Sequence, residues 1–219
     1  MPKATFLNLP EEKRERLIFL SFNEFAKNTY STASITQIAK EMRIAKGSIY
    51  QYFTNKRDLY DYLIERASHE KLDATAEYYK KSKDPLHKWL RKFCLASLWW
   101  DIQNPIMSCF LANVSKERSD EELGNVNLQH KKRSVEFFEK KIIKLIDKKE
   151  LDPSIQAHQT AIFLSEFANS LIDHLCNHFE IDLQQHAKAN TAVTKISQKE
   201  IKAYLKDFNP IILRLVKPM

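Results

Sequence analysis

The chain has 219 residues, of which two are glycine and three are cysteine, and its formal net charge is +7. So little glycine disfavours dinucleotide-binding folds, phosphate-binding loops and hairpin-rich sheets, because all of these need a positive φ or a close backbone approach. The cysteines (Cys94, Cys109 and Cys176) are widely spaced without a CxxC pair, which argues against a cystine scaffold and a cysteine-rich zinc module. We therefore expect an all-helical protein of the cytoplasm.

The N-terminal quarter of the chain predicts three helices. A stripe of apolar residues at steps of three and four predicts a helix over 11–27, which Pro10 and an acidic first turn open. Ser34 takes the N-cap position of a short helix over 35–42, and another short helix over 46–52 follows after a tight turn. Two short helices joined in this way form a helix-turn-helix. The apolar stripe of the first helix comprises Leu17, Ile18, Ser21, Phe22 and Phe25.

The remainder of the chain also predicts helices. Asn55 can cap a helix over 56–81, whose length suits a strut between two domains. Prolines favour the first turn of a helix, so Pro85, Pro105 and Pro153 indicate further helix starts. Pro210 predicts a kink near Asn209 within the last helix. These later helices are expected over 85–101, 105–114, 123–149, 153–179 and 197–216.

Two polar segments predict connectors between these helices. Residues 115–127 are polar and charged, and residues 182–194 have no sustained apolar period. The apolar stretches elsewhere are far shorter than the roughly 18 residues that span a bilayer, and the first residues lack the pattern of a targeting signal. We expect no membrane partner.

Positive charge gathers around the predicted helix-turn-helix. A recognition helix offers its N-terminal half to the major groove of DNA, where polar side chains contact base edges and a glycine permits close backbone approach. Here Lys46 could bind guanine or neutralise a phosphate, and Gln51 is the best candidate for reading a base. The alternative is that Tyr50, Tyr52 and Phe53 pack a small helical core, which is the favoured interpretation for Phe53 alone. The cations of residues 25–57 are Lys27, Lys40, Arg43, Lys46, Lys56 and Arg57, against Glu41 as the one anion counted there.

Residues 17–59 resemble the DNA-binding region of the tetracycline-repressor (TetR) family of bacterial transcriptional regulators. The match is Ser34-Ile35-x-x-Ile38-Ala39, then Ile44-Ala45-Lys46-Gly47-Ser48-Ile49-Tyr50-x-Tyr52-Phe53, then Asn55-Lys56-x-x-Leu59. The family often has glycine where this chain has Thr29 and Arg43, and serine where it has Ala45. A positive φ at Arg43 would cost about 1 kcal/mol in a residue other than glycine.

The resemblance implies an N-terminal helix-turn-helix DNA-binding domain (residues 1–55) and a C-terminal helical ligand-binding and dimerisation domain (residues 56–219). It predicts a homodimeric regulator, expected to be a repressor, that binds a palindromic operator in double-stranded DNA and is released by a small apolar or aromatic effector. The predicted DNA-binding residues are Ser34, Thr36, Gln37, Lys46, Gly47, Ser48, Tyr50, Gln51, Tyr52 and Lys56.

The resemblance also places an effector site and a dimer surface in the C-terminal domain. Aromatic residues and methionine beside the break at Asn104-Pro105 suit a pocket for an apolar molecule, although any helical core needs the same residues. The predicted effector-binding residues are Trp99, Trp100, Met107 and Phe110. The two last helices would form a four-helix bundle with a second subunit, while an ordinary monomer core is the alternative. The predicted interface residues are Leu164, Ala168, Leu171, Ile172, Leu175, Tyr204 and Phe208.

Other kinds of chemistry find little support in the sequence. His174 and His178 have the i, i+4 spacing that can hold a metal ion, but a third ligand would have to come from elsewhere, so we predict no metal site and no cofactor. The motifs of hydrolases, metalloproteases and nucleotide-binding enzymes are absent, and we predict a protein that is not an enzyme. The alternative from another class is a helical scaffold or partner-binding protein that does not bind DNA.

Overall fold

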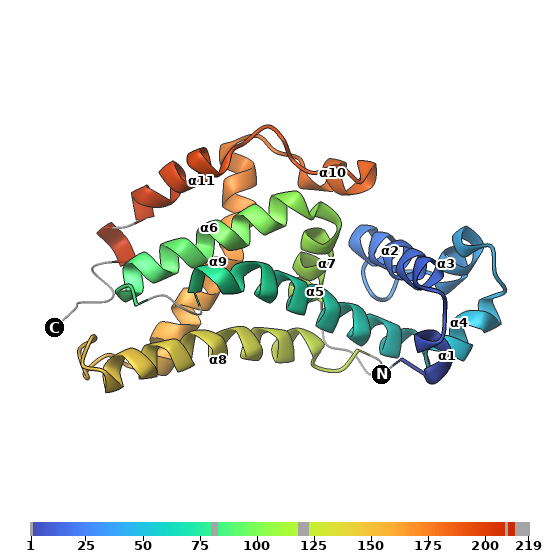
Figure 1. The fold of residues 1–219 in the computed structure, drawn as a ribbon, viewed down its shortest axis with the longest axis horizontal. Helices are drawn as coiled ribbons and strands as arrows, with labels where there is room; N and C mark the ends of the chain where they lie inside the picture. The colour runs from blue at the N-terminus through green and yellow to red at the C-terminus, as the bar shows by residue number, and fades with distance from the viewer. Residues whose placement is uncertain (1, 80–82, 118–122, 209, 213–219) are drawn as a thin grey trace. The chain divides into compact units, whose positions relative to one another are not determined.

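The computed structural model describes residues 2–79, 83–117, 123–208 and 210–212, and within these ranges the regular elements are all helices (Figure 1). None of the described helices is both long and apolar enough to cross a membrane. The elements are α1 (Ala4–Leu7), α2 (Glu11–Lys27), α3 (Ile35–Met42), α4 (Lys46–Tyr52), α5 (Lys56–Tyr79), α6 (Leu86–Gln103), α7 (Pro105–Lys116), α8 (Val126–Asp147), α9 (Ala157–His178), α10 (Leu183–Ala189), α11 (Gln198–Tyr204) and a 3-10 helix over Leu205–Phe208.

The chain divides into two compact units. Unit 1 contains the predicted DNA-binding region 1–55 together with the first part of α5, α7 and α10. Helix α5 is continuous, and its residues after Glu70 belong to unit 2. Unit 1 comprises Met1–Glu70, Asn104–Asn127 and Leu183–Ala192, and unit 2 comprises Lys71–Gln103, Leu128–Asp182 and Val193–Met219.

The core of unit 1 forms around α2. All five residues of the predicted apolar stripe of this helix are buried, which confirms the prediction from their spacing. Helix α7 packs against α2, and the rings of Phe25, Tyr60 and Phe110 meet with centroids 4.9–6.4 Å apart. The side chain of Asn113 donates to the carbonyls of Phe25 and Ala26 at 3.1 and 3.0 Å. These bonds satisfy carbonyls near the end of α2 that have few partners within the helix.

Residues 182–194, predicted to be a connector, contain the helix α10 in unit 1. This helix packs against α7 and α2, and Ala187 is its buried residue. Seven residues with a single buried side chain show no apolar period, so the pattern could not indicate the helix. Tertiary packing stabilises α10, because isolated helices of this length are marginal in water.

Unit 2 contains α6, α8, α9, α11 and the end of α5. The rings of Trp89 and Phe93 on α6 meet those of Phe137 and Phe138 on α8, with centroids 5.3–6.1 Å apart. The ammonium of Lys71 lies 2.7 Å from both carboxylate oxygens of Asp101, whose side chain is 4% exposed. Unit 2 thus combines an apolar aromatic core with a buried ion pair.

Several helix ends depart from the predictions. The helix expected from Pro153 begins at Ala157 instead, because the Asp152 side chain accepts the backbone N–H of Ser154 and closes a turn there. The helix expected over 197–216 begins with a capping box between Ser197 and Glu200, but ends at Tyr204. A 3-10 helix follows over Leu205–Phe208, and residues 210–212 are again α-helical, with Pro210, which has no N–H to donate, among them. Asn209 and residues 213–216 lie outside the described residues.

Candidate nucleic-acid interface

Helix α3 has the bounds and the N-cap that its sequence predicts. The Ser34 side chain accepts the backbone N–H of Gln37 at 3.2 Å, and the N–H of Ser34 donates to Glu24 at 2.7 Å. Ile38 is buried, whereas Thr36 and Gln37 are exposed at the N-terminal turn. The first turn of α3 is therefore held by two side chains and faces solvent, with the positive end of the helix dipole available to an anion.

The turn between α3 and α4 has the positive φ predicted for it. Arg43 adopts φ 58° and ψ 41°, in the left-handed region. The N–H of Arg43 donates to Lys40 and that of Ile44 to Ala39, both at 3.0 Å. These two bonds are typical of a helix that ends in a left-handed residue, and they offset a strain of about 1 kcal/mol in a residue other than glycine.

Helix α4 presents one polar face outward. Lys46, Gly47, Tyr50 and Gln51 are exposed, whereas Ile49 on the opposite side is buried. Positions i, i+1, i+4 and i+5 share a face of an α-helix, so these four residues form a single surface. We call Lys46, Gly47, Tyr50 and Gln51 the α4 surface.

The other predicted residues of the recognition helix lie beside this surface or in the core. Phe53 is fully buried, which confirms its interpretation as a core residue. Ser48 and Tyr52 are half-buried, and the Tyr52 ring lies 6.5 Å from that of Phe6 on α1. Tyr50 is 37% exposed, so its side chain is not part of the core.

Packing within the protein does not require a glycine at position 47. A Cβ atom built at this position meets no atom within 4 Å. Glycine inside a helix costs roughly 0.5–1 kcal/mol relative to alanine. Gly47 therefore lowers helix stability at a position that faces outward. A glycine there leaves room for the backbone of a partner molecule to approach.

The start of α5 contributes two cations with different environments. Asn55 caps the helix, as predicted, by accepting the N–H of Asp58 at 2.8 Å. The ammonium of Lys56 donates to the carbonyl of Ser31 at 3.4 Å and lies 4.6 Å from the Tyr30 ring centroid. Arg57 pairs with Asp61 at 2.8 Å, so its charge is compensated within the unit.

The exposed cations close to the helix-turn-helix in sequence are Lys27, Lys40, Arg43 and Lys46.

Helix α1, which packs against α4, is an element that the sequence pattern does not predict. Phe6 is fully buried against Phe53 and Tyr62, with ring centroids 4.9 and 5.5 Å away. The carbonyls of α4 accept hydrogen bonds from Lys3 and Thr5. A helix of four residues leaves no periodic pattern, so the apolar Phe6 is the one signal that the sequence carries for it.

The predicted effector residues do not gather within one unit. Trp100 is buried and Trp99 half-buried in unit 2, and the Lys71 ammonium lies 5.5 Å from the Trp100 ring. Met107 and Phe110 belong to unit 1, where Phe110 is fully buried in the aromatic core. A pocket formed by these residues stays a prediction.

The predicted dimer residues divide into core and surface. Leu164, Leu171 and Leu175 on α9 are buried inside unit 2, so their side chains pack its own core, and their part in a dimer interface stays a prediction. The outward side of α9 instead exposes Ile162 and Phe163. The half-buried members of the predicted set are Ala168, Ile172, Tyr204 and Phe208.

The two histidines with metal-ligand spacing lie on the exposed side of α9. His174 and His178 are both exposed, and the His178 ring lies 5.0 Å from that of Tyr204. Among the residues that the structure describes, no group of three or more histidine, cysteine or acidic side chains could hold a metal ion.

Comparison with known proteins agrees with this geometry. A family model described as bacterial regulatory proteins of the tetR family matches residues 20–63, a range that includes α3, α4 and the start of α5. A crystal structure of a TetR family transcriptional regulator from Chloroflexus aurantiacus superposes with a TM-score of 0.76 and 27% identity, over 100% of this chain and 99% of that one. The chain thus carries a DNA-binding region that matches the tetR family model and has the fold of a TetR-family regulator.

Two further relatives differ in how much of the chain they match. An HTH-type transcriptional regulator of Staphylococcus aureus strain USA300 is 32% identical over 77 residues, which are 35% of this chain and 40% of that protein's length. A TetR-like transcriptional regulator from Rhodococcus sp. RHA1 has a TM-score of 0.65 at 15% identity, over 94% of this chain and 99% of that one, and so shows the fold alone. TetR-family regulators are DNA-binding proteins and not enzymes.

Proposed function

We propose that this chain is a TetR-family transcriptional regulator of the cytoplasm that binds a palindromic operator as a homodimer and acts as a repressor. The α4 surface is the observation that carries this proposal. It combines a cation, a hydrogen-bonding amide and a glycine without a packing role on the outward side of the second helix of a helix-turn-helix. These are the residue types and the position that major-groove recognition requires.

The environment of each side chain suggests a role in the complex. The Gln51 amide can donate and accept in the bidentate pattern that reads adenine. Lys46 can bind guanine or a phosphate, and Tyr50 can contact the backbone or a thymine methyl group. The exposed first turn of α3, with Thr36 and Gln37, suits a phosphate next to the groove.

The dimer surface that we propose lies on the outward side of α9 and its edge with α11. Ile162 and Phe163 are 43% and 46% exposed, and they are large apolar side chains on a single turn of α9. Phe208 meets Tyr204 and Phe167 with ring centroids 5.3 and 5.4 Å away, so an aromatic edge adjoins α9. Exposed apolar groups of this kind favour contact with another apolar surface. A second copy of this chain would bring two recognition helices to the two half-sites of a palindrome.

A small apolar or aromatic effector would act from unit 2. Its aromatic residues are of the types that line pockets for such molecules, and α5 continues from unit 2 into unit 1 without a break. An effector that favours one position of α5 would change the placement of the recognition helices and weaken DNA binding. The size of this effect is limited by the preference of the effector for one state, typically 1 to 3 kcal/mol.

The experiment replaces Lys46 and Tyr50 with alanine together. We expect the dissociation constant for a duplex that the wild-type protein selects from a random-sequence pool to rise by about 100-fold or more, because two contacts of roughly 1–3 kcal/mol each are lost. Fluorescence anisotropy at several salt concentrations measures the affinity, and binding of the wild type should weaken steeply with salt. Circular dichroism and thermal unfolding check that the variant keeps its fold.

Two outcomes would contradict the proposal. Wild-type binding to duplex DNA could be absent or independent of salt, which would favour a helical scaffold that binds another kind of partner. Alternatively, the folded double variant could bind as tightly as the wild type, which would show that the α4 surface does not face DNA.

A further inference from the structure

The carbonyl end of the recognition helix is satisfied by the N-terminal segment, Lys3–Leu7. The last carbonyls of an α-helix have no partner within the helix and need donors from elsewhere. Ile49 receives the N–H of Phe53 at 2.9 Å. The next three carbonyls, those of Tyr50, Gln51 and Tyr52, accept hydrogen bonds from two residues of the N-terminal segment. Lys3 Nζ donates to Tyr50 at 2.8 Å, and the Lys3 N–H donates to Tyr52 at 2.9 Å. Thr5 Oγ1 donates to Gln51.

Helix α4 needs such support more than a longer helix would. It has seven residues, and its N-cap residue, Ala45, provides no side-chain hydrogen bond. Its second residue is Gly47, and glycine is a weak helix former. Isolated helices of this length do not persist in water, so contacts from outside the helix determine how well its backbone is ordered.

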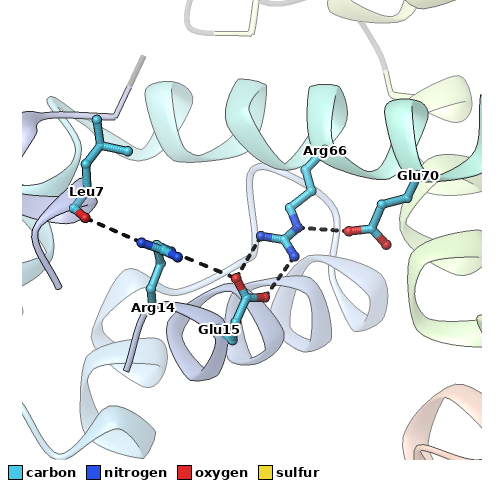
Figure 2. A network of polar contacts seen from close by, with 5 residues as sticks. All are labelled: Leu7, Arg14, Glu15, Arg66 and Glu70. Atoms are coloured by element: carbon cyan, nitrogen blue, oxygen red, sulfur yellow. Dashed lines mark hydrogen bonds and ion pairs between the residues drawn. The ribbon is translucent and has the colours of Figure 1, made fainter. Parts of the chain in front are cut away.

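The N-terminal segment is itself held through its last two residues. Phe6 is fully buried against Phe53 and Tyr62. The Leu7 carbonyl accepts from Arg14 at 3.4 Å, and Arg14 lies 4.0 Å from Glu15 (Figure 2).

Glu15 extends this network to α5. It forms a two-point ion pair with Arg66 at 2.8 and 3.0 Å, and Arg66 also bonds Glu70 at 2.9 Å (Figure 2). The segment is thereby connected to α2 and α5 as well as to α4.

We propose that the N-terminal segment is the C-terminal cap of the recognition helix, and that Lys3 and Thr5 are positioning residues that order α4 for DNA binding. The effect of the cap on DNA binding rests on the proposed function, whereas the cap itself is a property of the free protein. The ammonium of Lys3 is engaged by a carbonyl of α4, so its role is to hold the helix and not to neutralise a phosphate. A loss of the cap loosens the last turn of α4, where Tyr50 and Gln51 lie.

The first test follows amide hydrogen exchange in the free protein. Thr5→Val removes the hydroxyl donor and keeps the side-chain volume, so we expect the amides of Gln51, Tyr52 and Phe53 to exchange about 3- to 10-fold faster, as the loss of one hydrogen bond predicts. Thr5→Ser keeps the donor and should restore slow exchange. Thr194→Val, at an exposed threonine of unit 2, is the matched control and should change nothing in α4. Unchanged exchange in the Thr5→Val variant would overturn the proposal.

The second test separates positioning from direct DNA contact. Lys3→Met removes the ammonium, and we expect affinity for the selected duplex to fall about 3- to 10-fold at every salt concentration. The slope of log affinity against log salt should stay as in the wild type, whereas loss of a phosphate contact would reduce its magnitude by about 0.9. Lys140→Met, at an exposed lysine of α8, is the control for charge.

The two proposals fail in different ways. A reduced slope in Lys3→Met, with normal exchange in Thr5→Val, would show that Lys3 binds DNA and is not part of a cap. Wild-type protein that does not bind duplex DNA would refute the proposed function, and the exchange measurements would still decide whether the segment caps α4.

Discussion

Units 1 and 2 differ at the surfaces that we propose for their partners. Unit 1 has an interior of neutral aromatic rings and an exposed helix, α4, with a cationic and polar surface. Unit 2 buries the carboxylate of Asp101 against Lys71 and exposes Ile162 and Phe163 on α9. Charge on the outside favours a charged partner, whereas apolar groups on the outside favour an apolar one. The difference suggests that each unit serves a different partner.

The two interiors differ in the charge of their buried polar groups. In unit 1 the Tyr60 hydroxyl is buried, and burial raises the pKa of this tyrosine, so the group remains neutral. In unit 2 the ion pair of Lys71 and Asp101 must stay intact, since a buried carboxylate without its cation is costly. The core of unit 2 is therefore more sensitive to the loss of a single charge.

The largest expected effect concerns the exposed apolar side chains of α9 in unit 2. Ile162→Glu places a charge in the proposed dimer surface, and we expect the dimer dissociation constant to rise by more than about 100-fold, because a carboxylate without a partner is costly to bury. Sedimentation equilibrium measures the change, and operator affinity should fall with it. Ile143→Glu on α8 is the matched control, since Ile143 is 44% exposed and Ile162 43%. Equal effects of the two substitutions would argue against an interface on α9.

A second substitution tests the ion pair of unit 2. Lys71→Met leaves the Asp101 carboxylate buried without its cation, and we expect the free energy of unfolding to fall by about 2–3 kcal/mol, somewhat below the range for fully buried pairs because Lys71 is 28% exposed. Denaturant titration measures the change. Lys132→Met, which removes the exposed pair with Glu136, should cost less than about 0.5 kcal/mol. A loss of similar size in both variants would show that burial does not distinguish the two pairs.

The smallest expected effect separates stability from binding at the α4 surface. Gly47→Ala adds a methyl group that touches nothing within the unit, so we expect the free energy of unfolding to rise by roughly 0.5–1 kcal/mol. Affinity for the selected duplex should nevertheless fall about tenfold, because the methyl group would separate the helix from DNA. Thermal unfolding and anisotropy measure the two quantities. A variant that is more stable and binds normally would show that the backbone at this position stays away from the duplex.

The elements of the helix-turn-helix were predictable because their signals are local. Helices α2, α3 and α4 have the predicted bounds, and Ser34 and Asn55 cap the helices that they precede. A cap or an apolar stripe acts within one or two turns, so a few neighbouring residues suffice to indicate it. Arg43 illustrates the same point, since its positive φ follows from the turn that it occupies.

The predictions failed or fell short where distant segments meet. Helices α1 and α10 depend on packing against α4 and α7, and their own sequences are too short to show a period. The stripe of Leu164, Leu171 and Leu175 was recognisable as apolar, but spacing alone does not tell a core from an interface.

From the order of its amino acids alone, this protein is a chain of helices with a nucleic-acid reading motif near one end, since caps, turns and apolar periods act over a few residues. Only the tertiary structure decided which side of α9 is left exposed, that Asp101 is buried beside Lys71, and that residues 3–7 complete the end of α4. These features depend on pairs of residues that lie about 30 to 50 positions apart in the chain, such as Lys71 with Asp101 and Lys3 with Tyr50, and their contact is set by packing of the whole unit.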